Sequence, residues 1–151
     1  MLTVTNSLFD VCSSGTSGGG ISVFRIANVT LANVRVNNAV NMGFGGGCLG
    51  MTVDFNNVIN STLTVTNSVF RNCTAKSGQG GGIFLGKISA VALINVSVQN
   101  ATAALLGECL CAFGIAEHAI WSLAVADSVF ADCKENLEGE GVRIRQDTQD
   151  T

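Results

Sequence analysis

Proline and tyrosine are absent from the 151 residues, and histidine and tryptophan occur once each. Charged residues are also scarce, at 13% of the chain, and the net charge is only -3. There is no basic cluster that could neutralise a phosphate backbone, so we expect no nucleic-acid partner. No apolar run reaches 18 residues, and residues 1–6 lack the basic and apolar regions of a signal peptide. Export would therefore need a signal outside this chain.

The chain is rich in apolar residues, which make up 47% of it, and it contains 18 glycines. This content is enough for a sizeable core in one domain. The bias toward Val, Asn and Gly suits strands and turns rather than helices.

A repeat organises the whole sequence. The segment LTVTNSLFDVC at 2–12 returns as LTVTNSVFRNC at 63–73 and as LAVADSVFADC at 123–133, and two weaker copies begin at residues 29 and 91. The repeating unit is therefore one coil, and the coils alternate between an odd type and an even type. We number the coils 1 to 5, with approximate ranges 2–28, 29–62, 63–90, 91–122 and 123–145, followed by a polar tail at 146–151.

Within each copy, apolar residues alternate with Thr or Ala, which is the period of a strand with one buried face. The fifth and tenth positions hold Asn or Asp in nine of ten cases. We expect these residues at corners, where amides of successive coils hydrogen bond to one another in ladders. The ladder residues are Asn6, Asn33, Asn67, Asn95 and Asp127 at one corner, and Asn38, Asn72, Asn100 and Asp132, with Val11 in coil 1, at the other.

A further strand follows a glycine-rich turn in each coil. Its inward residues are expected to be Ile21 with Val23, Cys48 with Gly50, Ile83 with Leu85, Cys109 with Cys111, and Val142 with Ile144. Three short strands per coil, stacked about 4.8 Å apart, predict a single all-β domain over 1–151, a three-sided parallel β-helix of about five coils. The chirality of parallel crossovers makes it right-handed. A leucine-rich repeat is the alternative, but the glycine starts and the two Asn corners per coil argue against it.

The motif F-x-x-N or F-x-x-C, followed about ten residues later by G-G-[AG]-[ILV], occurs at 70–73 with 80–83 and at 9–12 with 18–21. This pairing resembles the repeats of chlamydial polymorphic membrane proteins and related pectin-lyase-like β-helix proteins. The resemblance spans nearly the whole chain and implies a β-helix fold and a secreted or cell-surface protein. Such families include adhesins, passenger domains and carbohydrate-active enzymes.

Six cysteines raise the question of disulfides or a metal site. Two sets occupy equivalent positions in alternate coils: Cys12, Cys73 and Cys133, and Cys48 and Cys109. Equivalent positions two coils apart lie about 9.6 Å from each other, beyond the limit of about 7 Å between the Cα atoms of a disulfide. Cys109 and Cys111 form a C-x-C with no second pair and no nearby histidine to complete a zinc site. We therefore favour buried free thiols over disulfides or a metal, and we expect no cofactor.

Five N-x-[ST] sequons occur, at Asn28, Asn60, Asn72, Asn95 and Asn100. The last three are corner residues whose side chains we expect to point inward. Asn28 and Asn60 are then the plausible glycan sites, provided that they are exposed.

Catalysis on an outer strand face is one functional alternative, because sugar cleavage needs clustered acids or bases, or bound calcium. The outward residues of the second strand include one acid, Asp10, which could form a small polar patch with Arg35 and Arg71. The paired aspartates and the Gly-His-Gly segment of polygalacturonases are absent, so we favour a solvated face and assign no catalytic residue. Threonine rows on the first strand of coils 1 and 3 make ice binding a weaker alternative to a docking face.

The even coils carry long loops at 51–62 and 112–122. Insertions in repeat proteins gather on one side and often form the binding face. Our candidate ligand- or partner-binding residues are therefore Phe55, Phe113, His118 and Trp121, which could stack on a sugar ring or a partner side chain. Packing of these apolar residues on the solenoid wall is the simpler interpretation.

The sequence thus predicts a non-catalytic, adhesin-like extracellular or surface scaffold that binds a glycan or a protein on the long-loop side. A polysaccharide lyase or hydrolase and a structural spacer are the alternatives. Coil 1 opens directly with core strand residues, and uncapped solenoid ends expose apolar layers. We therefore expect end-to-end self-association or continuation in a longer chain.

Overall fold

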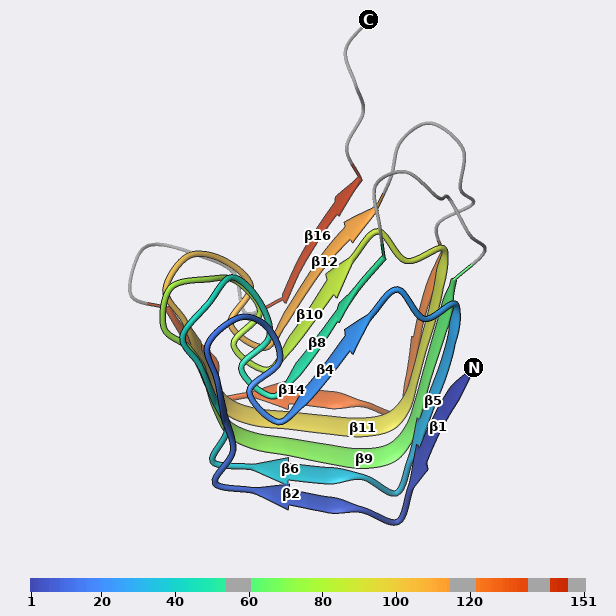
Figure 1. Cartoon of the computed structure of the whole chain (residues 1–151), viewed down its shortest axis with the longest axis horizontal. Coiled ribbons are helices and arrows are strands. Elements are labelled where there is room, and N and C mark those ends of the chain that lie inside the picture. The colour runs from blue at the N-terminus through green and yellow to red at the C-terminus, as the bar shows by residue number, and fades with distance from the viewer. Residues whose placement is uncertain (54–60, 115–121, 136–141, 147–151) are drawn as a thin grey trace, which may run out of the picture.

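A computed structural model describes residues 1–53, 61–114, 122–135 and 142–146. These residues form sixteen strands and no helix, so nothing in the described part could cross a membrane as a helix. The strands are parallel and stack in five coils as a β-solenoid with three walls (Figure 1). This architecture confirms the fold class that the repeat predicts.

Each wall takes one strand from each coil. The first wall contains β1 (Leu2–Thr5), β5 (Asn28–Ala32), the beginnings of β9 (Thr62–Ala75) and β11 (Ala90–Ala103), and β13 (Ser122–Ala126). The second wall contains β2 (Leu8–Asp10), β6 (Arg35–Asn37), the middle parts of β9 and β11, and β14 (Val129–Ala131). Beyond the second corner, the short strands β3 (Ser13–Ser14), β7 (Val40–Asn41) and β15 (Lys134–Glu135) extend the same sheet. The third wall is a separate sheet of β4 (Ile21–Phe24), β8 (Leu49–Thr52), β10 (Ile83–Gly86), β12 (Leu110–Gly114) and β16 (Val142–Gln146).

The core fills the space between the walls and is built from stacked equivalent positions. On the second wall, the inward residue alternates between Phe in the odd coils and Val in the even coils, in the order Phe9, Val36, Phe70, Val98 and Phe130. Phe70, in the central coil, is fully buried between the two valines. Large and small side chains therefore interleave from coil to coil, as dense packing requires.

The third wall corrects the expected inward residues in coils 2 and 4. The pairs Cys48 with Gly50 and Cys109 with Cys111 were wrong by one position, because the strand register places Leu49 with Met51 and Leu110 with Ala112 beside Ile83 and Leu85. In the strand register, the glycine run at 45–47 begins one residue before the position that corresponds to Gly80, the first glycine of the run at 80–82. The landmark shared by the coils is instead the positive-φ glycine three residues before the strand, which is Gly18, Gly46, Gly80 and Gly107.

The corners carry the predicted ladders. All ten corner positions have positive φ, between 49° and 56°, which Asn and Asp tolerate better than most residues. Their amides bond from coil to coil, with Asn33 to Asn6 at 3.1 Å, Asn95 to Asn67 at 2.8 Å, Asn72 to Asn38 at 2.9 Å and Asn100 to Asn72 at 2.8 Å. The expected inward orientation of these side chains was wrong, because the asparagines of both ladders are exposed. The positive φ turns the chain so that the side chain lies along the outside of the corner.

The cysteines also correct an expectation. Cys48 forms a disulfide with Cys73, and Cys109 forms one with Cys133, so four of the six are not free thiols. Each bond joins an even coil to the next odd coil, with Cα atoms 5.2 Å and 5.5 Å apart. Equivalent positions two coils apart are indeed too distant, but these bonds cross the interior between different positions of adjacent coils.

Candidate functional site

The predicted binding residues of the long loops are not brought together in the described part of the chain. Phe55, His118 and Trp121 lie outside the described residues. The backbone of Phe113 is placed in β12, in register with Gly86 of β10, and its side chain also lies outside the description. The strands that flank both loops belong to the same two walls, and the long-loop site itself stays a prediction.

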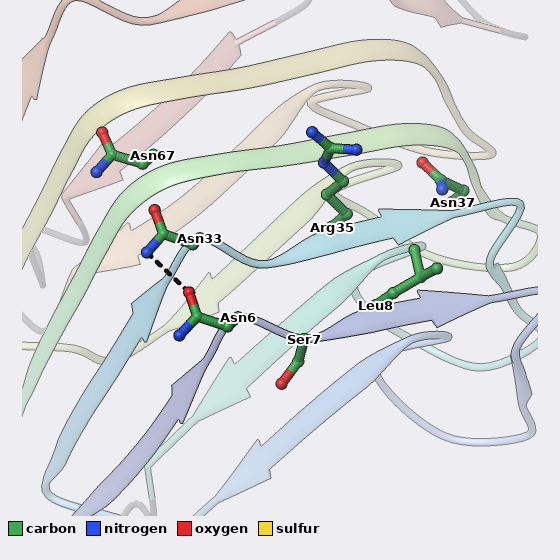
Figure 2. Close-up of a pocket in the computed structure, with 7 residues that line it drawn as sticks. All are labelled: Asn6, Ser7, Leu8, Asn33, Arg35, Asn37 and Asn67. Atoms are coloured by element: carbon green, nitrogen blue, oxygen red, sulfur yellow. Dashed lines mark hydrogen bonds between the residues drawn. The ribbon is translucent and has the colours of Figure 1, made fainter.

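A recess of about 500 Å³ lies elsewhere, on the outside of the second wall beside the first corner. It is formed where coils 1, 2 and 3 stack, and Figure 2 shows Arg35 rising from β6 between the corner asparagines and Asn37. Its lining is mostly amide and hydroxyl side chains, from Asn6, Ser7, Leu8, Asn33, Arg35, Asn37 and Asn67.

Strand alternation places these side chains outside. Val36 is fully buried in the core, so its neighbours Arg35 and Asn37 in β6 must point away from it. Leu8 of β2 is in register with Arg35, and its side chain is 65% exposed. The recess is therefore a direct product of the same period of two that builds the core.

The first ladder is interrupted at this recess. Asn33 donates to Asn6, and Asn95 donates to Asn67, but no hydrogen bond joins the described residues Asn33 and Asn67. The Oδ1 of Asn33 and the Nδ2 of Asn67 are thus left as one acceptor and one donor at the edge of the recess. Such a pair matches the hydroxyl groups of a sugar, each of which both donates and accepts.

Arg35 is the one charged residue among those that line the recess. No acidic side chain occurs among the lining residues, and Arg35 makes no ion pair within the described residues. Asp10, the one acid expected on this face, accepts hydrogen bonds from the Nδ2 of Asn38 at 2.9 Å and from the backbone of Val11 at 3.1 Å. Arg71 lies in register with Asn37 and adds a second guanidinium to the same wall.

This arrangement can bind an anion, and its lining lacks the carboxylate pair that glycoside hydrolysis uses. A guanidinium presents parallel N–H donors that match a carboxylate, and the surrounding amides can bond to neutral polar groups. Glycoside hydrolysis uses a pair of carboxylates on either side of the scissile bond, and the recess lining has none. The described residues also contain no group of three His, Cys, Asp or Glu side chains placed to hold a metal ion.

No family model, curated protein or solved structure matches the chain. Of the recess residues, the sequence marked Arg35 as part of an outer polar patch and Asn6, Asn33 and Asn67 as ladder residues. Their convergence was missed because each strand was considered by itself. The available signal was the two-residue step from Asn33 to Arg35, which places an outward guanidinium directly after a corner amide.

Proposed function

We propose that the chain is a non-catalytic, adhesin-like extracellular or surface scaffold that binds an acidic glycan on the outside of its second wall. The observation that carries this proposal is Arg35, an exposed guanidinium that makes no ion pair within the described residues and is set in an amide-rich recess with no acidic residue in its lining. Flanking amides offer hydrogen bonds to hydroxyl groups, while Arg35 offers a charged contact to a carboxylate.

The flat, rigid wall favours an extended ligand. Arg35 and Arg71 lie on adjacent strands, two positions apart along the strand direction. From the strand geometry, their Cα atoms are separated by about 8 Å. Two guanidiniums at this spacing could contact two acidic groups of one glycan chain. A ligand of one sugar residue would need only one guanidinium.

Disulfides support the extracellular assignment. Cys48 and Cys73 are fully buried and bonded, and the same pattern recurs between Cys109 and Cys133. Structural disulfides persist in oxidising compartments and are rare in the cytosol of most organisms. A repeated, interior disulfide pattern is therefore expected of an exported scaffold.

The test is binding of the oxidised chain to a glycan array in which each uronate- or sialate-bearing glycan is paired with its neutral counterpart. We expect the acidic member of a pair to bind and the signal to fall as the salt concentration rises. Arg35→Gln should weaken binding about ten-fold, because it removes a charge-assisted hydrogen bond.

Arg25→Gln is the matched control. It removes the same charge from a different part of the surface, where the guanidinium lies 4.9 Å from the centre of the Phe24 ring. Equal weakening by both substitutions, or equal binding of acidic and neutral glycans, would contradict the proposed site. Release of shortened products from the bound glycan would contradict the non-catalytic part of the proposal.

A further inference from the structure

Cys12 occupies the position that forms a disulfide in the other odd coils. Val40 bonds to the carbonyl of Cys12, and Thr74 bonds to the carbonyl of Ala39, so Cys12, Ala39 and Cys73 stack at one position of successive coils. Cys133 takes the same position in coil 5, opposite Ala101. Cys73 and Cys133 are bonded, whereas Cys12 is a partly buried free thiol.

The partner position is the residue directly before the third-wall strand, and it faces the next coil. A Cβ atom added to Gly20 or Gly82, which hold this position in the odd coils, would collide with the Cγ1 atom of a valine in the following coil, Val36 or Val98. The even coils carry Cys48 and Cys109 at the same position, and these bond to the cysteine of the following odd coil. Every disulfide therefore runs forward, from an even coil to the next odd coil.

By this rule the partner of Cys12 belongs to a coil stacked against the outer edge of coil 1. The other cysteine outside the two disulfides is Cys111, which lies in coil 4 and donates a hydrogen bond to Gln79. Cys111 lies three coil-to-coil spacings from Cys12, a distance of about 14 Å, so the two thiols cannot meet.

The outer edge of coil 1 has the features of a docking surface for such a coil. Within the described residues, β1, β2, β3 and β4 each pair with a strand of coil 2 only, which leaves their other backbone edge unpaired. The core residues Leu2, Val4 and Phe9 are partly exposed there, although their counterparts in coil 2 are fully covered. An unpaired edge with an open apolar layer is a template for another strand set.

A second copy stacked end to end does not fit this surface. The residue before β16 in coil 5 is Gly141, so the last coil offers no thiol to Cys12. Coil 5 is also an odd coil, and stacking it on coil 1 would set Phe130 against Phe9. Within the chain, each Phe instead stacks on a Val.

We propose that the edge formed by β1 to β4 docks a β-solenoid coil of the even type, and that Cys12 forms a disulfide with the cysteine directly before the third strand of that coil. The two thiols lose two protons and two electrons, and a disulfide oxidant such as oxidised glutathione accepts them and becomes two thiols. The bond would be the third member of the series begun by Cys48–Cys73 and Cys109–Cys133.

The test adds one even coil to the full chain. A copy of residues 29–62, which contains a single cysteine, replaces Met1, so that Thr62 of the copy precedes Leu2. The copied Cys48 then stands 25 residues before Cys12, the same separation as in Cys48–Cys73. After refolding in a glutathione buffer, peptide mapping without reduction should find the new disulfide, and Cys12 should no longer react with iodoacetamide.

The matched control carries Cys48→Ser in the copy alone, and its Cys12 should stay reactive. Detection of Cys48–Cys73 and Cys109–Cys133 in the same digests shows that the original coils have folded. A reactive Cys12 in the extended chain with both original disulfides present would overturn the proposal. In the 151-residue chain, a Cys12–Cys12 dimer formed in preference to a mixed disulfide with glutathione would also overturn it, in favour of a second copy as the occupant.

Discussion

Cys48 and Cys73 are joined across the interior of the solenoid, from the start of the third wall in coil 2 to the position directly after the second corner in coil 3. Their bond adds a covalent link between two coils that also contact each other through strand pairing, core packing and side-chain hydrogen bonds such as that from Asn72 to Asn38. Cys109 and Cys133 repeat the arrangement between coils 4 and 5. Coils 3 and 4 have no disulfide between their described residues, and they are joined by the long pairing of β9 with β11 and by the pairing of β10 with β12.

Removing the first of these bonds should destabilise the fold. The double substitution Cys48→Ala and Cys73→Ala opens a loop of 25 residues in the unfolded chain, which corresponds to about 3.5 kcal/mol in the loop-entropy description. Urea denaturation of the oxidised proteins measures the change. Cys12→Ala is the control, and an equal loss in the control would show that thiol packing rather than the cross-link is responsible.

Gly82 should be far less tolerant of a methyl group than Gly15. A Cβ atom on Gly82 would collide with the Val98 side chain and the backbone oxygen of Cys109, whereas nothing lies within 4 Å of one on Gly15. We expect Gly82→Ala to lower the free energy of unfolding by about 1–3 kcal/mol, the range for overpacked cores. Gly15→Ala should change it little. Gly82→Ala and Val98→Ala together should cost less than the sum of their separate costs, and additive losses would place the strain elsewhere.

The fold was predictable because one signal recurs in every coil. Leu2, Val29, Leu63, Val91 and Leu123 are far apart in sequence, yet they stack at one position of the first wall. Five repetitions of the same alternation leave little freedom in register for the first two strands. The third strand was less constrained, because runs of glycine at 18–20, 45–47 and 80–82 can be aligned in two ways. Only the backbone shows which glycine has the positive φ.

The disulfides and the recess depend on relationships that a comparison of equivalent positions does not reveal. Cys48 and Cys73 occupy different positions in different coils, and the recurring separations of 25 and 24 residues were the signal for them. The recess requires Asn33, Arg35 and Asn67 to meet around a corner. Periodicity predicts which way each of these side chains points. The depth of the recess that they line depends on how sharply the chain turns at the corner.

Val11→Asn should stabilise the protein. Val11 is the one residue at the two ladder corners that is neither Asn nor Asp, and it has a φ of 51° that a β-branched side chain adopts at a steric cost. We expect a gain of about 1 kcal/mol from relief of that strain, measured by thermal or urea denaturation. Asn38→Val places the same side chain at the equivalent corner of coil 2 and should have the opposite effect. It also removes the hydrogen bonds to Asp10 and Asn72. A loss of stability in Val11→Asn would contradict this account of the corners.

Ser68 and Ser7 are equivalent residues that should differ sharply when truncated. The Oγ of Ser68 accepts a 3.1 Å hydrogen bond from the backbone N–H of Val34 in the preceding coil and donates one of 2.8 Å to the carbonyl of Thr66. Ser7 makes the second of these bonds, to Thr5, but it has no described coil before it to supply the first.

Ser68→Ala therefore leaves the buried N–H of Val34 without its acceptor, which should cost about 1–3 kcal/mol of the free energy of unfolding. Ser7→Ala should cost much less, because only a local bond is lost. Hydrogen exchange gives an independent readout. The exchange rate of the Val34 amide should rise in Ser68→Ala and stay unchanged in Ser7→Ala. If both variants lost stability equally, the bond within each turn would be the important one, and the serines of the odd coils would have no role in joining one coil to the next.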